Sequence, residues 1–336
     1  MDLSTTYLGF RLPHPFVAGP SPLTDSLDHI RALEDAGAAA VVLPTLFEEE
    51  IRSEQLALHS VMDTPAESFG EALSYFAELE HSLASADEYM ERLRAVKESV
   101  QMPVMASLNA VATQGWADLA RLIEQAGADA LELDFYLVAI DATESGETIE
   151  QRWVEALTEV RRAVSIPVSV KLTPFYTSLA HFSGRLVGAG ADGLVLLHRF
   201  YEPDLDVENL EARSRLELSD SRELLLRLRW LAIVSGTVKC SLAVTGGVHS
   251  VDDAVKAIMT GAHAVQMVSA LLAKGPDHLR TMRLGLDRWL EEHEYESLKQ
   301  MCGSMNLQHI PEPKVLSRAH YMYLLRSWEA RHAARR

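Results

Sequence analysis

The sequence predicts an α/β fold in which eight parallel strands alternate with helices and close into a (β/α)8 TIM barrel. Three observations support this: eight short apolar runs recur along the 336 residues, helical patterns separate them, and the runs are apolar throughout rather than alternating. Continuous apolar runs are typical of parallel strands covered on both faces. The expected strands are Phe16–Gly19, Ala39–Leu43, Val104–Leu108, Ala130–Phe135, Val168–Leu172, Gly193–His198, Ser241–Thr245 and Ala264–Val268.

Glycine and proline residues mark the boundaries of these runs. Gly37, Gly127 and Gly190 each close a helical pattern just before an apolar run, a place where glycine readily ends a helix. Pro103 and Pro167 stand at the start of two runs, where the missing N–H of proline does no harm to a strand. The helices expected between the strands include Ser26–Ala36, Asp87–Val100, Trp116–Ala126, Ile149–Val164, Ser221–Val234 and Val251–Thr260.

The chain divides into one barrel and a tail. We expect the barrel to span residues 1–300 and residues 301–336 to form a tail with one helix. The start, Thr5–Leu12, alternates around a glycine and predicts a short hairpin that closes the bottom of the barrel. The stretches 47–84 and 199–220 follow the second and sixth strands and are longer than ordinary loops. Long loops on this face are expected to form lids and substrate walls.

Composition limits the possible partners and compartment. The formal net charge of −17 argues against a nucleic acid or an anionic membrane surface as the partner. The two cysteines, Cys240 and Cys302, cannot build a disulfide framework, which suits a reducing cytoplasm. We see no signal peptide and no apolar run near the roughly 18 residues that a membrane span needs. We therefore expect a cytoplasmic protein that acts on a small molecule.

The last two expected strands each lead into a turn that offers backbone amides. Gly246 and Gly247 directly follow the strand ending at Thr245, and glycine lets a backbone come close to a ligand. Val268 is followed by Ser269 at the start of a helix, where a phosphate is stabilised. Two such loops at the C-terminal face of a barrel predict a phosphate site.

Four motifs give the chain a resemblance to a known family. His14–Gly19 is similar to a first-strand Asn-Pro-Phe…Ala-Ser-Gly motif, and Val170–Pro174 to Val-Lys-Leu-Pro-Pro. Thr245–Val248 resembles Thr-Gly-Gly-Ile, and Val265–Leu271 resembles Leu-Gln-Ile-Gly-Thr-Ala-Leu. In this order, the motifs resemble the dihydroorotate dehydrogenases of the soluble, FMN-containing type, and more closely a divergent dihydroorotate dehydrogenase-like subgroup. The resemblance covers residues 3–300.

The resemblance implies a flavoprotein with FMN at the top of the barrel and a homodimeric assembly. Lys171, the only charge in its apolar run, would then stabilise the negative charge of the reduced flavin. The phosphate would lie on Gly246, Gly247 and Ser269, with Val268 in place of the family's glycine. The cofactor-binding residues implied in this way are Ala18, Gly19, Thr45, Asn109, Asp134, Lys171, Leu197, Gly246, Gly247, Val268 and Ser269.

The chain also departs from the family pattern. Pro44 and Thr45 stand where the family has a flavin-contacting lysine and a serine. Leu137 stands at the position of the cysteine general base, and leucine cannot accept a proton. Asp134 and Ala139 occupy two of the positions where the family's asparagines bind orotate. His198 occupies another, and the loop after the second strand reads 68-SFGE-71. Loss of such polar contacts weakens recognition of orotate strongly.

Other residues offer replacement chemistry at the same face. Tyr136 and His198 follow the fourth and sixth strands, and histidine titrates in the range useful for proton transfer. Asp134 would hydrogen-bond the flavin or orient His198. The alternative is that His198 only lines the pocket and Tyr136 only packs. We count Lys171, His198 and Tyr136 as the candidate catalytic residues and expect no metal site. The acidic run Glu48–Glu50 indicates a solvated helix face.

Taken together, the sequence predicts an FMN-dependent oxidoreductase of the dehydrogenase type acting on CH–CH donors. It would transfer a hydride between a small substrate and flavin N5, and dihydroorotate is not the expected substrate. Two alternatives stay open: an authentic dihydroorotate dehydrogenase of pyrimidine biosynthesis with a substituted base, or a non-catalytic barrel acting as a partner subunit.

Overall fold

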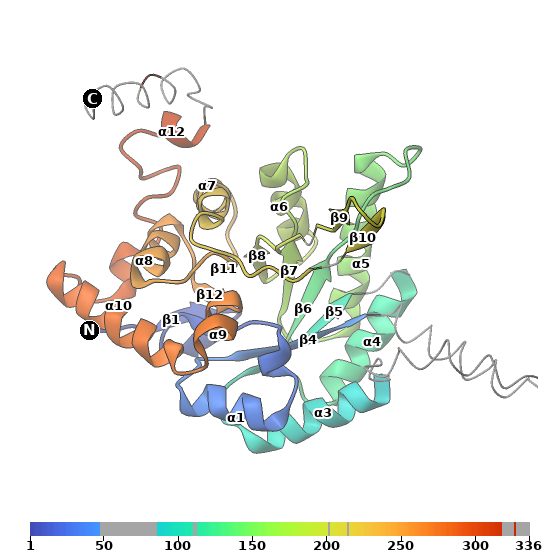
Figure 1. Ribbon diagram of the computed structural model, residues 1–336, viewed down its shortest axis with the longest axis horizontal. Coiled ribbons are helices and arrows are strands. Elements are labelled where there is room, and N and C mark those ends of the chain that lie inside the picture. Colours follow the sequence, from blue (N-terminus) through green and yellow to red (C-terminus); the bar gives the residue numbers. More distant parts are fainter. Residues whose placement is uncertain (48–85, 110–112, 201, 214, 318–325, 327–336) are drawn as a thin grey trace, which may run out of the picture.

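The computed structural model describes residues 1–47, 86–109, 113–200, 202–213, 215–317 and 326. Eight strands form a closed barrel in the order β11-β12-β3-β4-β5-β6-β7-β8, and neighbouring strands run parallel (Figure 1). The (β/α)8 TIM barrel expected from the sequence is confirmed. The barrel strands are β3 (Phe16–Ala18), β4 (Val41–Phe47), β5 (Val104–Asn109), β6 (Ala130–Phe135), β7 (Val168–Leu172), β8 (Gly193–Leu196), β11 (Ser241–Thr245) and β12 (Ala264–Met267).

Three strands, β6, β7 and β11, have the expected bounds, and most of the others differ from them by one or two residues. The largest difference is in β4, which begins at Val41 and continues to Phe47, well beyond the expected Leu43. Its pairing with β5 shifts register between Val42 and Thr45. Pro44 lies inside this irregular stretch, and a proline has no N–H to give to a sheet.

Helices follow most of the barrel strands and surround the barrel (Figure 1). Ser26, Ser145 and Ser250 each cap a helix by accepting a hydrogen bond from a backbone amide three residues later. The cap at Ser145 starts α5 three residues before the expected Ile149. The longer helices are α1 (Leu27–Asp35), α3 (Ala86–Ser99), α4 (Thr113–Gln125), α5 (Gly146–Ala163), α6 (Leu179–Gly188), α7 (Leu224–Ser235), α8 (Val251–Thr260), α9 (Ser269–Lys274) and α10 (His278–Glu292).

The N-terminal hairpin closes the bottom of the barrel, as expected. Strands β1 (Thr5–Tyr7) and β2 (Phe10–Leu12) pair antiparallel. The Leu8 amide donates to Ser241 Oγ at the start of β11, over 2.9 Å. Thr5 Oγ1 donates to the carbonyl of His263 just before β12, also over 2.9 Å. Both contacts lie at the N-terminal ends of the barrel strands.

The two stretches expected as long loops have different outcomes. The stretch after β8 contains a second antiparallel hairpin, β9 (Asp204–Asp206) with β10 (Glu211–Arg213) (Figure 1). Nearly all of the stretch after β4, with the 68–71 motif and the acidic run 48–50, lies outside the described residues.

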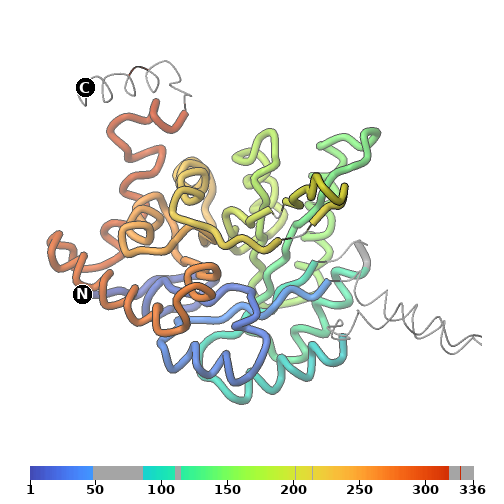
Figure 2. Tube along the Cα trace, in the orientation of Figure 1, coloured from blue at the N-terminus to red at the C-terminus, as the bar shows by residue number. Residues whose placement is uncertain are grey.

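The tail begins on the barrel. Backbone amides of Gly303, Met305 and Leu307 donate to carbonyls of α8 and α7. The short helices α11 (Leu298–Met301) and α12 (Lys314–Ser317) lie in this region. The boundary at residue 300 stays a prediction. The first residues of the chain lie beside the later helices (Figure 2), and the backbone of Asp2 bridges to Ser297. Within the described ranges, none of the helices has the length and apolar character required to cross a membrane.

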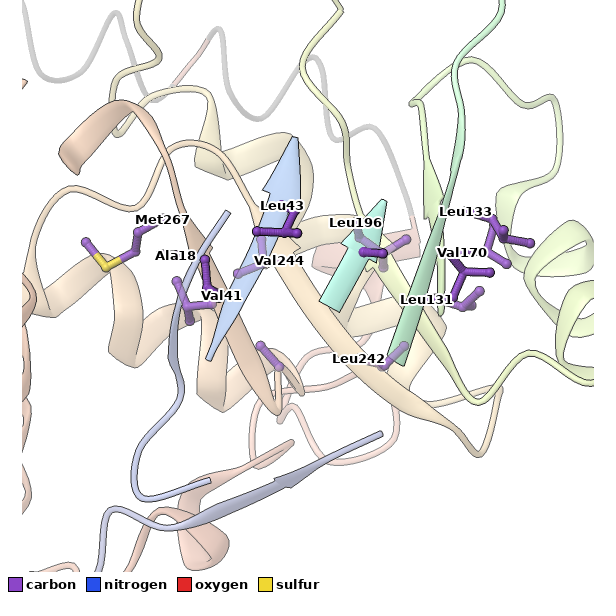
Figure 3. Close-up of a cluster of buried hydrophobic side chains, with 14 of the residues drawn as sticks. Ala18, Val41, Leu43, Leu131, Leu133, Val170, Leu196, Leu242, Val244 and Met267 are labelled. Carbon is purple, nitrogen blue, oxygen red and sulfur yellow. The ribbon is translucent and has the colours of Figure 1, made fainter. Parts of the chain in front are cut away.

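Two apolar clusters hold the fold together. The larger lies between the outer face of the barrel and the helices, and Figure 3 shows part of it. The smaller lies inside the lower half of the barrel, where the hairpin side chains of Tyr7, Leu8 and Leu12 meet inward-facing residues of the strands. Those inward residues include Val17, Ala40, Val42, Met105, Ala130, Val195, Ala243 and Ala264.

Candidate active site

The upper half of the barrel interior is polar. Side chains alternate along a strand, so the residues two and four positions beyond the apolar lower cluster also face inward. At these positions β5, β6, β11 and β12 carry polar or charged side chains, and β7 adds Ser169 and Lys171 in register with Glu132 and Asp134 of β6; all are buried. They are Ser107, Asn109, Glu132, Asp134, Ser169, Lys171, Thr245 and Gln266.

Lys171, Glu132 and Gln266 meet in the middle of the barrel. Lys171 Nζ lies 3.2 Å from Glu132 Oε1, and both side chains are at most 5% exposed. Gln266 Nε2 donates to the other carboxylate oxygen of Glu132. Gln266 Oε1 has no hydrogen-bond partner among the described residues. A buried ion pair of this kind is held in place because each charge would be costly alone.

Asp134 and His198 form a second pair one layer higher. His198 Nδ1 lies 3.0 Å from Asp134 Oδ1, and only 1% of the Asp134 side chain is exposed. Burial alone would raise the pKa of Asp134, but the positive charges of Lys171 and His198 outweigh burial, so the pKa lies below the usual 3.8. Asp134 is therefore ionised at neutral pH and orients the His198 ring.

Tyr136 extends this pair toward the surface. Its ring lies tilted against His198 with 5.0 Å between ring centroids, and it stacks on Phe200 at 4.9 Å. Asn109 Nδ2 donates to the backbone carbonyls of Asp134 and Tyr136, over 2.9 and 3.2 Å. Asn109 thus holds the end of β6 in place. All three candidate catalytic residues, Lys171, His198 and Tyr136, lie at the C-terminal face, where barrel enzymes carry their active sites.

The glycine turn after β11 forms as expected. Gly246 and Gly247 both have φ of +79°, a conformation that favours glycine. A Cβ on Gly246 would lie 2.8 Å from Arg227 Nη2, and one on Gly247 would lie 2.6 Å from the Leu224 amide nitrogen. A side chain at either position would therefore strain the turn and crowd its neighbour.

Ser219 links the two loops that the sequence assigns to phosphate. Its hydroxyl accepts from the Gly247 amide over 3.1 Å, and its own amide donates to Ser269 Oγ over 3.1 Å. The two loops therefore do come together, with Ser219 between them. Ser219 belongs to the long stretch after β8, and a serine in a loop carries no sequence signal that would single it out.

Arg227 adds a buried cation to the same turn. The side chain is 4% exposed, and Nε donates to the carbonyl of Thr245 over 2.5 Å. Nη1 donates to the carbonyl of Glu223 over 2.8 Å. Burial lowers the pKa of Arg227 below its usual value, yet a guanidinium stays charged. Positive charge beside a glycine turn suits an anionic ligand.

The remaining expected cofactor residues frame this face. The Thr45 and Ser107 hydroxyls lie 2.8 Å apart. The Ala18 and Gly19 amides donate to neighbouring backbone carbonyls. The Val268 side chain packs so close to Gly19 that a Cβ there would lie 2.7 Å from Val268 Cγ2. Leu197 is almost wholly buried.

These residues fit FMN in chemical character. The buried Lys171 ammonium and the unpaired Gln266 Oε1 offer a charge and an acceptor to a polar ring system. Arg227 and the glycine turn offer positive charge and close backbone approach to a phosphate. In the part of the chain that the structure describes, no three His, Cys, Asp or Glu side chains gather as a metal site would require.

Sequence reasoning missed Glu132, Gln266, Ser219 and Arg227. Glu132 could have been found, because it is an acidic residue in an apolar run next to the run that carries Lys171. Arg227 is a single cation inside the otherwise apolar stretch 224–228.

Comparison with known proteins identifies relatives of one kind. A family model described as dihydroorotate dehydrogenase matches residues 81–290. The NAD-dependent dihydropyrimidine dehydrogenase subunit PreA of Escherichia coli (strain K12) is 24% identical over 350 aligned positions, covering 96% of this chain and 81% of the relative. The catalytic subunit of dihydroorotate dehydrogenase B (NAD(+)) from Thermoplasma acidophilum is 25% identical over 315 positions, covering 90% and 98%.

A further relative is the corresponding catalytic subunit from Methanothermobacter thermautotrophicus, 27% identical over 225 positions, which cover 65% of this chain and 73% of the relative. These names describe dehydrogenases, and the expectation of an oxidoreductase is confirmed at that level. The family model covers more than half of the residues and includes Lys171, Asp134 and His198, so this chain belongs to the dihydroorotate dehydrogenase family.

Proposed function

We propose that the chain is an FMN-dependent oxidoreductase that acts on a CH–CH bond of a small molecule, with hydride passing between the substrate and flavin N5. The observation that carries this proposal is the buried Lys171 ammonium beside the Asp134–His198 pair at the ends of three neighbouring strands. The relatives, named for dihydroorotate and dihydropyrimidine oxidation, support the same reaction type.

The chain's own residues divide the work of holding the cofactor. Lys171 and Gln266 would contact the ring, and Gly246, Gly247 and Arg227 would hold the phosphate. When bound, FMN supplies the hydride acceptor. The Lys171 ammonium stabilises negative charge at the ring edge, because a fixed cation in a buried site acts with little screening.

His198 is the proposed proton carrier. Asp134 is bonded to Nδ1, so the proton exchanged with the substrate is carried at Nε2. The carboxylate of Asp134 also stabilises the protonated ring, as an orienting acid does for a general base. Tyr136, packed on the ring face, holds the imidazole in place.

We propose a substrate other than dihydroorotate. Leu137, at the position of the family's cysteine, is 37% exposed and has no group that accepts a proton. Asp134 is ionised and stands where an asparagine would contact orotate, which is itself an anion. The negative charge of Asp134 at a substrate-contacting position would repel the negative charge of orotate.

The test is anaerobic reduction of the protein loaded with FMN. We expect the purified chain to bind FMN stoichiometrically and to show flavin absorption bands. Dihydrouracil, dihydroorotate and other CH–CH donors are then added in turn, and bleaching of the bands reports hydride transfer. A chain that binds no FMN overturns the proposal. Bleaching by dihydroorotate would instead identify an authentic dihydroorotate dehydrogenase, and binding without bleaching by any donor would favour a non-catalytic subunit.

We extend the proposal to a homodimer in the cytoplasm; the dimer rests on the resemblance, and the compartment on the free cysteines Cys240 and Cys302, which suit a reducing environment. Light scattering on the purified protein gives the mass. A monomer mass would contradict the dimer without affecting the proposed chemistry.

A further inference from the structure

A cavity opens beside the candidate active site. It has a volume of about 430 Å³ and lies between the segment after β6, the start of α5 and the segment after β7. Asp134, His198 and Lys171 do not line it, whereas Leu137 and Ala139, at the positions of the family's general base and of one orotate-binding asparagine, do. Phe200 reaches it from the segment after β8 and separates it from Tyr136, on which Phe200 stacks.

Aromatic rings form much of the cavity wall. Phe135 and Trp153 stack at 4.4 Å between centroids, and Phe175 meets Phe200 edge to face at 4.8 Å. Phe175 is 65% exposed although it is a large apolar side chain. Exposed aromatic faces at the mouth of a cavity favour a flat apolar ligand.

The charged residues of the wall are all acidic. Asp141, Glu144 and Glu150 line the cavity, and among the described residues that line it there is no lysine, arginine or histidine. Arg152 pairs with Glu144, and Arg185 lies 3.4 Å from Glu150. Two guanidinium groups therefore face three carboxylates, which leaves one net negative charge.

Asp141 supplies that charge. Its carboxylate accepts hydrogen bonds from the amide and the hydroxyl of Thr143, over 2.8 and 2.7 Å. The Thr143 hydroxyl and amide hold the pKa of Asp141 below its usual value. An ionised carboxylate in the same cavity wall as the exposed Phe175 ring is suited to a cation, because the ring face is also attractive to positive charge.

We infer that this cavity binds a small organic cation: a flat apolar body with one ammonium or amidinium group. The aromatic rings would contact the apolar body of the ligand, and the Asp141 carboxylate would pair with its cationic group. This inference does not rest on the flavin proposal, because it needs neither FMN nor turnover.

Calorimetric titration with tryptamine tests it, with indole-3-propionate as the matched anion that carries the same ring. We expect tryptamine to bind at least tenfold more tightly than indole-3-propionate. Phe175→Ala should weaken tryptamine binding by roughly 2- to 30-fold, the range for loss of a cation–π contact. Asp141→Asn should weaken it by roughly two- to fivefold, as for a solvent-exposed charge pair.

Both substituted side chains are exposed, so the variants should fold, and circular dichroism checks this. Leu284→Ala and Asp287→Asn change an exposed leucine and an exposed aspartate of α10, outside the cavity lining, and should leave binding unchanged. The inference is overturned if tryptamine does not bind at millimolar concentration, if the anion binds equally well, or if neither Phe175→Ala nor Asp141→Asn weakens binding.

Discussion

The lower and upper halves of the barrel interior are built from the same strands but serve opposite purposes. In the lower half, Met105 and Ala130 pack against the hairpin in a hydrophobic cluster. Two residues further along the same strands, Ser107 and Glu132 are polar and equally buried. Burial of apolar groups stabilises a fold, whereas burial of charge is costly unless it is paired. The lower half therefore supports an upper half that is arranged for chemistry.

The largest expected effect comes from breaking the buried ion pair of the upper half. Lys171→Met leaves Glu132 as an uncompensated buried charge and should lower the free energy of unfolding by about 3–5 kcal/mol. Urea denaturation measures this loss. The double variant Lys171→Met/Glu132→Gln removes both charges and should recover most of the stability. A loss of less than about 1 kcal/mol in the single variant would show that Lys171 does not compensate a buried charge on Glu132.

Truncating an apolar side chain of the N-terminal hairpin should affect only the stability of the fold. Leu12 is 1% exposed, and Leu12→Ala should cost about 2–5 kcal/mol through lost contacts and a residual cavity. FMN binding by the folded variant should be unchanged, because the hairpin lies at the end of the barrel opposite to the candidate active site. Leu284→Ala, at an exposed position, is the control and should stay within about 0.5 kcal/mol of the parent protein. Weaker FMN binding in Leu12→Ala would show that the two halves are coupled.

Two buried titratable groups, His14 before β3 and Asp134 in the upper half of the barrel, should respond to acid in different pH ranges. Burial lowers the pKa of His14, which precedes β3, from 6.5 to about 4. Because the unfolded chain binds a proton below pH 6.5 and the folded chain does not, stability should fall by about 3 kcal/mol between pH 6.5 and 4.

The pKa of Asp134 lies below 3.8, so its contribution is present above pH 3.8 and is lost only as the pH falls below that value. His14→Asn should flatten the stability profile between pH 6.5 and 4, whereas His198→Gln should alter it below about pH 4. Thermal unfolding across this range measures both. An unchanged slope in His14→Asn would contradict the assignment.

The smallest expected effect comes from alanine substitutions at two glycines. Comparing them separates the cost of backbone strain from the cost of a side chain that crowds a neighbouring residue. Gly246 and Gly9 have nearly the same φ, +79° and +83°, but only Gly246 has a neighbour, Arg227, that a Cβ would meet. Both alanine variants should lose about 1 kcal/mol from backbone strain. Gly246→Ala should lose a further 1 kcal/mol or so and bind FMN more weakly. Equal losses and equal FMN binding would remove the turn from the proposed phosphate site.

The barrel was predictable because each of its strands is a local pattern. Apolar runs such as Ala130–Phe135 and Val168–Leu172 are bounded by glycine and proline, and the structure places these strands at the same residues. Lys171 could be singled out for a similar reason, as a charge where the pattern allows none. The continuation of β4 to Phe47 was not predictable, because cross-strand pairing with β5 carries the strand past Pro44.

The partners of the site residues were harder to predict. The pairing of Asp134 with His198 was one of two roles considered for Asp134, and it depends on the register of β6, β7 and β8. Ser219 and Arg227 reach the glycine turn from a loop and a helix whose own patterns say nothing of that turn. Long-range contacts of this kind depend on tertiary packing, which a single sequence does not display.

The bridge made by Ser219 has a consequence for protein engineering. Loops of barrel enzymes are often exchanged as independent modules, but here the sixth loop supplies hydrogen bonds to both the seventh and the eighth. Grafting or shortening the stretch before Ser219 would therefore disturb the turns after β11 and β12 at the same time. Any redesign of substrate preference on this scaffold should change the sixth, seventh and eighth loops together.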